Sequence, residues 1–292
     1  MFRSTFRAAA CVLVCSVAAP VAVVVTVVGA FLLIPLPATL PEAHAVQGSI
    51  VSHVLDKDGN EIAVFREFEQ NLPVQPQDIP LVLKQAVIAS EDRNFYHHGG
   101  VDMRGSARAL MADIRNESFV QGGSTITQQY VKNAYTGKQR TLVRKMRELV
   151  LASQLDRRTP KDQILFKYLE SIYLGEGAYG VGAASQTYFR HRVNTLSLSE
   201  AALLAGIIPA PSRYEPRGSP QAAESRREAV LAKMLQQRYI NDQQYATAIQ
   251  QRVTSAANAK PGVPLTGIFP AQQESTKYPY FVDYVRRYLI AR

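Results

Sequence analysis

The stretch 79–100, IPLVLKQAVIASEDRNFYHHGG, places a glutamate among apolar residues at a helical spacing. Leu83, Val87, Glu91 and Phe95 recur every fourth residue, so on a helix they would share one face. A carboxylate on a buried face loses hydration, and this raises its pKa toward the range of a general acid or base. The alternative is a helix that frays just before Glu91 and turns its carboxylate to solvent.

The composition fits a globular protein with an anionic partner. The chain has 292 residues, 47% of them hydrophobic, which suffices for one large or two small domains. The net charge of +9 favours nucleic acid, anionic lipid or a phosphorylated substrate as the partner. RNA-binding signatures, zinc-finger spacing and basic leucine-zipper patterns are absent from the sequence, so no nucleic-acid partner is expected.

No charged residue lies between Arg7 and Glu42. This stretch exceeds the roughly 20 apolar residues that span a bilayer as a helix. With arginines before it, the positive-inside rule predicts a cytoplasmic tail over residues 1–7, a transmembrane signal anchor over 8–36, and the rest of the chain on the extracytoplasmic face of the cytoplasmic membrane. A cleaved signal peptide with Ala-His-Ala at 43–45 is the alternative, although the apolar region is long for one.

The remaining chain predicts one hairpin followed by helices. Val51–Phe65 reads as two strands around Asp58-Gly59, a strong hairpin signal. Residues 103–114 predict an amphipathic helix, either an ordinary surface helix or a lobe resting on the membrane. Residues 141–174 predict a long helical region interrupted at Thr159-Pro160.

Three later helices begin at recognisable start signals, namely Ser197-x-x-Glu200, Ser219-Pro220 and Asn241-x-x-Gln244. Residues 254–279 are rich in Ala, Pro, Gly and Gln and predict a linker. A last helix is expected over residues 280–292.

The sequence QGGSTITQQYVKN combines two glycines with a helix start. Thr125-x-x-Gln128 has capping-box spacing, and Ser124 is the alternative cap. Free N–H groups at a helix start suit a phosphate, and Lys132 and Arg140 could complete a diphosphate clamp. The alternative is an ordinary helix start.

Arg144 and Lys145 precede Glu148 by four and three residues, so the three side chains share one helix face. The ordinary meaning of this pattern is a solvated salt-bridge cluster, unless that face lines the same cleft as Glu91. Residues 175–180 match G-x-G-x-x-G, but the match follows a helical pattern and not a strand. We therefore read it as a tight loop between helices and reject a dinucleotide site.

Together these stretches resemble the peptidoglycan glycosyltransferases, the family-51 glycosyltransferases of bacterial cell-wall synthesis, from about Val51 to about Tyr245. Five motifs occur in order: Glu91-Asp92-x-x-Phe95-x-x-His98-x-Gly100, Gly122-x-Ser124-Thr125-Ile126-Thr127-Gln128-Gln129, Arg144-Lys145-x-x-Glu148, Lys161-x-x-Ile164-Leu165-x-x-Tyr168-Leu169, and Arg226-Arg227-x-x-Val230-Leu231. Phe166 and Glu170 stand where the fourth motif usually has glutamate and asparagine, which leaves the role of that motif open here.

The resemblance implies a mainly α fold: a lysozyme-like, two-lobed glycosyltransferase domain over 48–253, with a short N-terminal β-hairpin, an N-terminal transmembrane helix and a smaller lobe at the membrane. Residues 254–292 would be a linker and the start of a missing or truncated downstream domain, because the tail resembles the segment before the transpeptidase domain of class A penicillin-binding proteins. A monofunctional enzyme is the second choice. The chain as given has no S-x-x-K and no K-T-G, so it is not expected to react with penicillin.

The resemblance also implies the chemistry. Lipid II would be the acceptor and the growing glycan strand the donor, at the bacterial cytoplasmic membrane and in contact with the cell-wall synthesis machinery. Glu91 would be the general base and Glu148 the second essential acidic residue. Lys132, Arg140, Ser124 and Gln128 would bind the departing diphosphate. The other positions that match the family's site are Asp92, His98, Thr125, Gln129, Arg144, Lys145, Lys161 and Arg227. A divalent cation, Mg²⁺ or Mn²⁺, near the diphosphate is left open, and no organic cofactor is implied.

Two other functions compete with this one. A lytic transglycosylase would use Glu91 as a general acid on existing glycan. A non-catalytic membrane scaffold would require a broken motif, yet Glu91, Lys132, Arg140 and Glu148 are all present. A metal site at the adjacent pair 97–98 is disfavoured, because neighbouring residues on a helix point apart.

Overall fold

The computed structural model of the chain describes residues 51–66, 70–102, 123–136, 142–258 and 264–270, with single positions at 29, 278, 280, 281, 284 and 288. The expected anchor over 8–36, the helix over 103–114, Arg140 and most of the expected helix over 280–292 lie outside these residues. Within the part that is described, no helix is long and apolar enough to cross a membrane.

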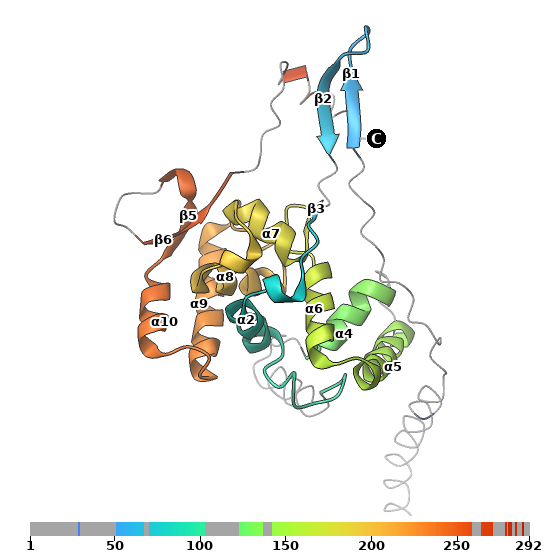
Figure 1. Ribbon diagram of the computed structural model, residues 1–292, viewed down its shortest axis with the longest axis vertical. Helices are drawn as coiled ribbons and strands as arrows, with labels where there is room; N and C mark the ends of the chain where they lie inside the picture. Colours follow the sequence, from blue (N-terminus) through green and yellow to red (C-terminus); the bar gives the residue numbers. More distant parts are fainter. Residues whose placement is uncertain are drawn as a thin grey trace, which may run out of the picture.

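The described residues are mainly helical, which confirms the predicted class. The helices are α2 (Leu81–Glu91), α4 (Ile126–Val131), α5 (Leu142–Arg158), α6 (Lys161–Ser171), α7 (Gly180–Phe189), α8 (Leu198–Ile207), α9 (Pro220–Gln236) and α10 (Asp242–Ile249). The strands are β1 (Val51–Leu55), β2 (Glu61–Arg66), β3 (Gln70–Asn71), β4 (Ala178–Tyr179), β5 (Arg252–Ser255) and β6 (Leu265–Ile268). Helices α2 and α8 lie in the middle of the helical body, between α4 and α5 on one side and α10, β5 and β6 on the other (Figure 1).

The predicted hairpin is confirmed. Strands β1 and β2 pair antiparallel, from Val51 opposite Arg66 inward to the turn. Gly59 takes the left-handed conformation, φ 84°, that the turn requires. The Asp56 carboxylate holds the turn, because it accepts hydrogen bonds from the backbone N–H groups of Asp58 and Asn60, each at 2.8 Å.

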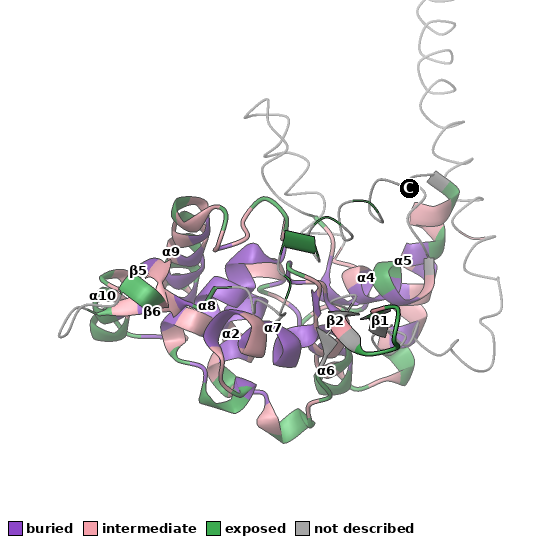
Figure 2. Cartoon of the chain, turned by 90° about the horizontal axis from the view of Figure 1, so that it is seen from above, coloured by how far each residue is buried: buried purple, intermediate pink, exposed green. Residues whose placement is uncertain are grey.

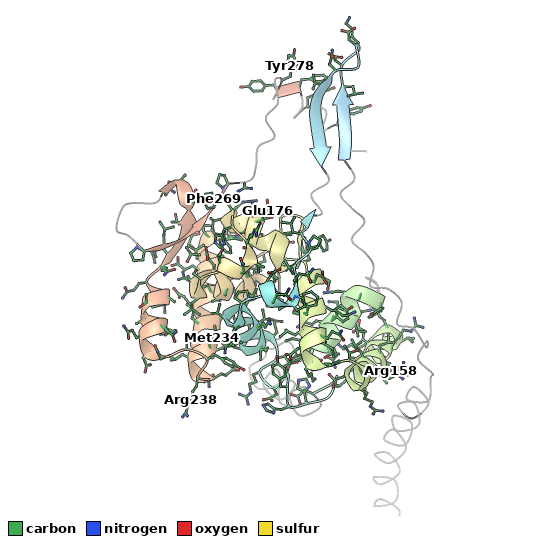
Figure 3. The ribbon with its side chains drawn as sticks, in the orientation of Figure 1. Arg158, Glu176, Met234, Arg238, Phe269 and Tyr278 are labelled. Carbon is green, nitrogen blue, oxygen red and sulfur yellow. The ribbon has the colours of Figure 1, made fainter. Side chains whose placement is uncertain are left out.

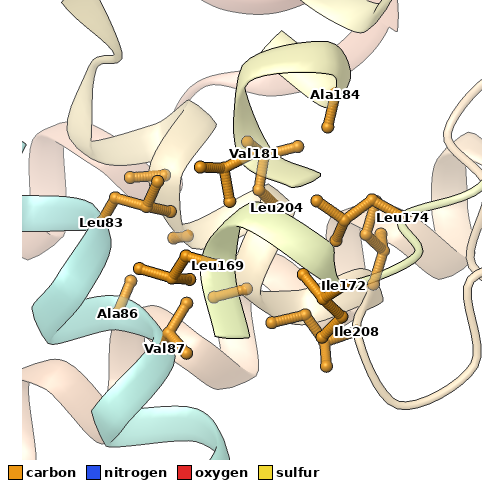
Figure 4. Close-up of a cluster of buried hydrophobic side chains, with 14 of the residues drawn as sticks. Leu83, Ala86, Val87, Leu169, Ile172, Leu174, Val181, Ala184, Leu204 and Ile208 are labelled. Carbon is orange, nitrogen blue, oxygen red and sulfur yellow. The ribbon is translucent and has the colours of Figure 1, made fainter. Parts of the chain in front are cut away.

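The core forms where α2 packs against helices later in the chain. Leu83, Ala86 and Val87 of α2 are buried and face Leu169 of α6 and Val181 of α7 (Figure 4). Helix α8 is buried on nearly all sides, and Figure 2 shows the purple of buried residues on it and on the part of α2 that packs into the core. A helix that is apolar all round belongs in the middle of a core. Helix α8 takes this position and packs against α2.

The predicted stripe is wrong at its last member. Helix α2 ends at Glu91, so Phe95 lies beyond the helix and is buried from the following turn. The alternative, a frayed helix with the Glu91 carboxylate turned to solvent, is also wrong, because Glu91 at the helix end remains partly buried.

Most helix boundaries follow the predicted signals. The long helical region breaks between α5 and α6 at Thr159-Pro160, as expected. Capping boxes are formed at Ser197 with Glu200 and at Asn241 with Gln244. Ser219 precedes α9 without a capping hydrogen bond from its side chain, and Pro220 occupies the first helical position.

The glycine-rich stretch 175–180 is a tight loop between α6 and α7, as predicted. Gly175, Gly177 and Gly180 have φ of 90°, 70° and 79°. A Cβ at Gly180 would lie 2.3 Å from the backbone oxygen of Glu170. The glycines therefore serve close packing of the loop on α6, and no nucleotide is needed to explain them.

The predicted linker is wrong over the residues described. Strand β5 reaches Ser255, and β6 pairs parallel with it over Leu265–Ile268. Val253 and Ile268 are buried against the helical body. The following residues are also fixed: Arg217 donates from Nε to the Phe269 carbonyl at 2.9 Å and from Nη1 to Glu176 at 2.8 Å. Figure 3 shows Phe269 and Glu176 at the same end of the body.

Arg227 was predicted to line the site, but the structure places it in the core with an exposed fraction of 0%. Its Nη1 donates to Ser199 Oγ at 3.1 Å, to Thr266 Oγ1 at 3.2 Å and to the Gln251 carbonyl. The guanidinium therefore ties α9 to α8 and to the β5–β6 pair. Burial lowers the pKa of Arg227, and the negative charges of Glu224 and Glu228 oppose this. The hydrogen bonds from Nη1 offset part of the lost hydration.

We predict that Arg227→Ala lowers the free energy of unfolding by about 3 kcal/mol or more, because several buried acceptors lose their donor. Chemical denaturation followed by circular dichroism measures this. Gln236→Ala, at an exposed position on the same helix, is the matched control and should change stability by less than about 0.5 kcal/mol. Equal stability of the two variants would contradict the anchoring role.

Candidate functional site

Glu91 lies at the carboxyl end of α2, where the core meets solvent. Gln129 of α4 donates from Nε2 to Glu91 Oε2 at 2.9 Å, and Ser90 Oγ donates to Oε1 at 3.3 Å. Desolvation raises the pKa of Glu91 above its ordinary value of 4.5, although the Gln129 hydrogen bond and the positive charges of Lys233 and Arg226 oppose this. The result is a carboxylate poised to accept a proton, held in place by a neutral donor.

Helix α9 fixes the backbone on which Glu91 sits. Lys233 Nζ donates to the Ser90 carbonyl at 3.0 Å, and Gln237 Nε2 donates to the Ala89 carbonyl at 3.1 Å. Both carbonyls belong to the last turn of α2, whose oxygens lack partners within the helix. Neither residue can be identified from the sequence, because a lysine and a glutamine on a helix surface carry no signal until α9 is packed on α2.

Asp92 joins the end of α2 to the start of α4. Its Oδ1 lies 2.7 Å from His98 Nε2, and its Oδ2 accepts the Ile126 N–H at 3.1 Å. Desolvation opposes a charge on His98, but the hydrogen bond to Asp92, helped by the Gly99 carbonyl, raises the pKa of His98. Asp92 and His98 were predicted to line the site, and the structure gives them the task of holding the loop after Glu91 against α4.

Thr125 is the cap of α4, which decides between the two predicted alternatives. Its Oγ1 donates to the Gly100 carbonyl at 2.7 Å and accepts the Gln128 N–H at 3.1 Å, while Gln128 Oε1 accepts the Thr125 N–H at 3.2 Å. Gly100 itself approaches α5 so closely that a Cβ would lie 2.0 Å from the Ala152 carbonyl oxygen.

This cap changes the predicted diphosphate site. The N–H groups of Ile126 and Gln128 at the start of α4 already donate to Asp92 and Thr125. Gln128 is buried and uses its side chain in the capping box. The expectation that this helix start cradles a phosphate is therefore wrong for these two groups, and Gln128 stabilises the helix that carries Gln129.

Glu148 of α5 is almost fully buried, 1% exposed, within a basic pair. Arg144 Nη1 donates to its Oε1, and Lys145 Nζ lies 3.5 Å from its Oε2. Lys145 also donates to Ser124 Oγ at 3.1 Å, just before α4 begins. The prediction that Arg144, Lys145 and Glu148 share one face of α5 is confirmed. The Lys145–Ser124 hydrogen bond links this face to the start of α4, whose Gln129 contacts Glu91.

The residues described do not fit a divalent cation. Both oxygens of Glu148 face cationic side chains. Across the described ranges, no group of three His, Cys, Asp or Glu side chains is arranged to hold a metal ion. We therefore derive no step through Mg²⁺ or Mn²⁺.

Two predicted site residues remain, Lys132 and Lys161, and the structure places them differently. Lys132 ends α4 in helical conformation and is exposed. It follows Gln129 by three residues, where α4 passes into a π-helical turn over Lys132–Thr136. Lys161 instead pairs with Asp156 at 2.6 Å and lies 4.6 Å from the centre of the Phe95 ring, a contact that fixes the loop after α2.

Helix α4 thus carries Gln129, which holds the Glu91 carboxylate, and is followed at its carboxyl end by the exposed Lys132. The transglycosylase family model matches residues 58–235, and the chain belongs to this family.

The curated relatives are penicillin-binding proteins. Penicillin-binding protein 1A of Aquifex aeolicus is 41% identical over 225 residues, which cover 76% of this chain and 31% of that protein. Penicillin-binding protein 1A of Escherichia coli K12 is 39% identical over 259 residues, covering 89% of this chain and 29% of that protein. The chain spans less than a third of the length of these relatives.

A crystal structure of penicillin-binding protein 1A from Haemophilus influenzae aligns with 84% of this chain and 24% of that chain. The sequence identity is 23% and the TM-score is 0.46, so the family assignment rests on the sequence comparisons alone.

The raised pKa of His98 predicts a pH-dependent part of the stability. Because the folded-state pKa lies above 6.5, the Asp92–His98 pair contributes fully below that pH and its contribution is lost as the pH rises through the raised pKa. Urea unfolding should show that His98→Gln destabilises the chain more at about pH 6 than at about pH 9. His97→Gln, at the adjacent exposed position, is the control, and a pH-independent His98 effect would contradict the assignment.

Proposed function

We propose that this chain is a peptidoglycan glycosyltransferase that polymerises lipid II into β-1,4-linked glycan strands, with Glu91 as the general base. The observation that carries the proposal is the desolvated carboxylate of Glu91, held by Gln129 one helical turn from Lys132. The family assignment supports the same reaction.

In the proposed step, Glu91 accepts the proton from the 4-hydroxyl of the acceptor GlcNAc. That oxygen attacks the anomeric carbon of the donor MurNAc on the face opposite its diphosphate, so the configuration inverts. The bond from the anomeric carbon to the diphosphate oxygen breaks, and undecaprenyl diphosphate leaves with the electron pair. Lys132, together with Arg140, stabilises the charge that develops on the leaving oxygens.

The two acidic residues have separate tasks in this account. Glu91 is desolvated and partnered by a neutral amide, which suits proton transfer. Glu148 is held between Arg144 and Lys145 and neutralises part of the basic cluster. We assign it to the orientation of that cluster, so that the basic groups present a fixed charge pattern to the diphosphate.

The proposed function also implies a membrane-anchored architecture. The domain would be lysozyme-like and two-lobed, anchored by residues 8–36 in the cytoplasmic membrane and facing outward. Its substrates are then the lipid-linked precursor and the growing strand, and other proteins of cell-wall synthesis are its partners. The net charge of +9 suits a surface of anionic lipid.

We expect Glu91→Gln to abolish polymerisation, with a fall in rate of at least about 100-fold, because the isosteric amide keeps the Gln129 contact but accepts no proton. Gel analysis of glycan chains formed from purified lipid II measures the effect, with and without moenomycin. Lipid II binding should change little. Glu228→Gln, a half-exposed carboxylate on α9, should retain activity. Long glycan chains from the Glu91 variant would remove this residue from the mechanism.

Lys132→Ala should lower the polymerisation rate by roughly 100-fold, because a fixed positive charge near the leaving group is lost. Lys132→Arg should recover part of the rate. Lys57→Ala, which removes an exposed lysine of the hairpin turn, tests for a general effect of charge. Equal rates for the Lys132 and Lys57 variants would exclude the proposed role.

A lytic transglycosylase is the second candidate, because a carboxylic acid with a raised pKa also suits a general acid. The two functions differ in substrate and product. Purified lipid II should yield polymer, whereas isolated sacculi should yield no soluble muropeptides. The reverse result would favour the lytic activity, and inactivity on both substrates would favour the scaffold.

A further inference from the structure

Three side chains from three helices form one continuous hydrogen-bonded chain that ends on Glu91. Tyr168 of α6 donates from its hydroxyl to Gln129 Oε1 at 2.9 Å. Gln129 of α4 donates from Nε2 to Glu91 Oε2 at 2.9 Å. The tyrosine has an exposed fraction of 0%, so the far end of this chain is anchored in the core.

The amide of Gln129 can in principle take two orientations, which exchange its oxygen and its NH₂ group. Only one of them presents a donor to the Glu91 carboxylate. The other places the amide oxygen against the carboxylate, an unfavourable contact unless Glu91 carries a proton. The carboxylate, which only accepts hydrogen bonds, favours the first orientation, and Tyr168 reinforces it by donating to the amide oxygen on the opposite side.

We propose that Tyr168 is a positioning residue that orients the Gln129 amide and thereby holds the Glu91 carboxylate as an oriented proton acceptor. The inference rests on the proposed function of Glu91 as the base.

The environment of Tyr168 keeps its hydroxyl protonated. Burial, reinforced by the negative charges of Glu91 and Asp92, raises the pKa of Tyr168 well above its ordinary value of 10.0. Its proton therefore stays on the hydroxyl at every working pH. Among the hydrogen bonds of the described residues, Gln129 Oε1 is the acceptor of that proton.

The chain also explains how a desolvated Glu91 remains usable as a base. Desolvation raises its pKa, and the hydrogen bond from Gln129 is the largest effect that lowers it. If the amide reversed, this lowering would be lost and the protonated acid would be favoured instead. Tyr168 thus acts on the protonation of Glu91 through Gln129 and without touching it.

Tyr188 of α7 provides a matched comparison. It is also 0% exposed, and its hydroxyl donates to the Leu174 carbonyl at 2.9 Å. Its hydrogen bond therefore resembles that of Tyr168 in burial and length but ends on the backbone, away from Glu91. Tyr168→Phe and Tyr188→Phe each remove one buried hydroxyl from the same core.

The first test compares polymerisation kinetics of the full chain on lipid II. Tyr168→Phe should lower kcat roughly 10-fold with little change in KM, and it should move the acid limb of the pH profile of kcat/KM to higher pH. Tyr188→Phe should leave both unchanged. If Gln129→Ala is made first, Tyr168→Phe should have no further effect, because its route to Glu91 is gone. Additive losses in the double variant would overturn the proposal.

A second readout does not depend on activity. The side-chain carboxyl of Glu91 can be titrated by carbon-13 NMR, with its signal assigned by its loss in Glu91→Gln. The midpoint should rise in Tyr168→Phe and not in Tyr188→Phe. A shifted midpoint in a chain that does not polymerise lipid II would support the positioning role and refute the proposed function. Equal midpoints in wild type and Tyr168→Phe would overturn the positioning role.

Discussion

The candidate site depends on the partial burial of a single carboxylate, that of Glu91. Helix α2 packs its apolar residues on α8 and α9, and this packing brings Glu91 to the edge of the core. Removing a carboxylate from water costs free energy unless hydrogen bonds and nearby charges compensate for the lost hydration. Here Gln129 supplies the hydrogen bond and Lys233 a positive charge from α9. The compensation is partial, so the pKa of Glu91 stays above its ordinary value, as the proposed role of a general base requires.

Helix α4 connects the parts of the site although it has only six residues. A helix so short has little stability of its own, so its position must come from its neighbours. Asp92 and Thr125 bind its amino-terminal N–H groups, and Tyr168 binds its Gln129 side chain. Each of these partners is buried. Gln129, which holds the Glu91 carboxylate, and Lys132 are thereby presented from one rigid support, which is the condition for fixed groups to act on a transition state.

Much of the fold and several site residues could be predicted, for identifiable reasons. The hairpin, the break at Thr159-Pro160 and the capping boxes depend on local geometry, which a short sequence contains. The tertiary partners could not be predicted in this way. Arg227 matched a family motif, yet its acceptors lie on segments far apart in the sequence. The linker was predicted from composition alone, which cannot show that β5 pairs with β6, because this pairing joins residues that are distant in the sequence. Lys233 had no recognisable spacing to Glu91 because the two meet only after α9 packs on α2.

The central claim is that the Glu91 carboxylate meets the acceptor sugar while Lys132 meets the diphosphate. A crystal structure of the full chain with a non-reactive lipid II analogue tests this most directly. The account predicts the acceptor 4-hydroxyl within hydrogen-bonding distance of Glu91, roughly 2.6–3.2 Å, with the diphosphate of a bound donor analogue beside Lys132. An analogue bound with its sugar away from Glu91, or with its diphosphate on a different face of α4, would contradict it.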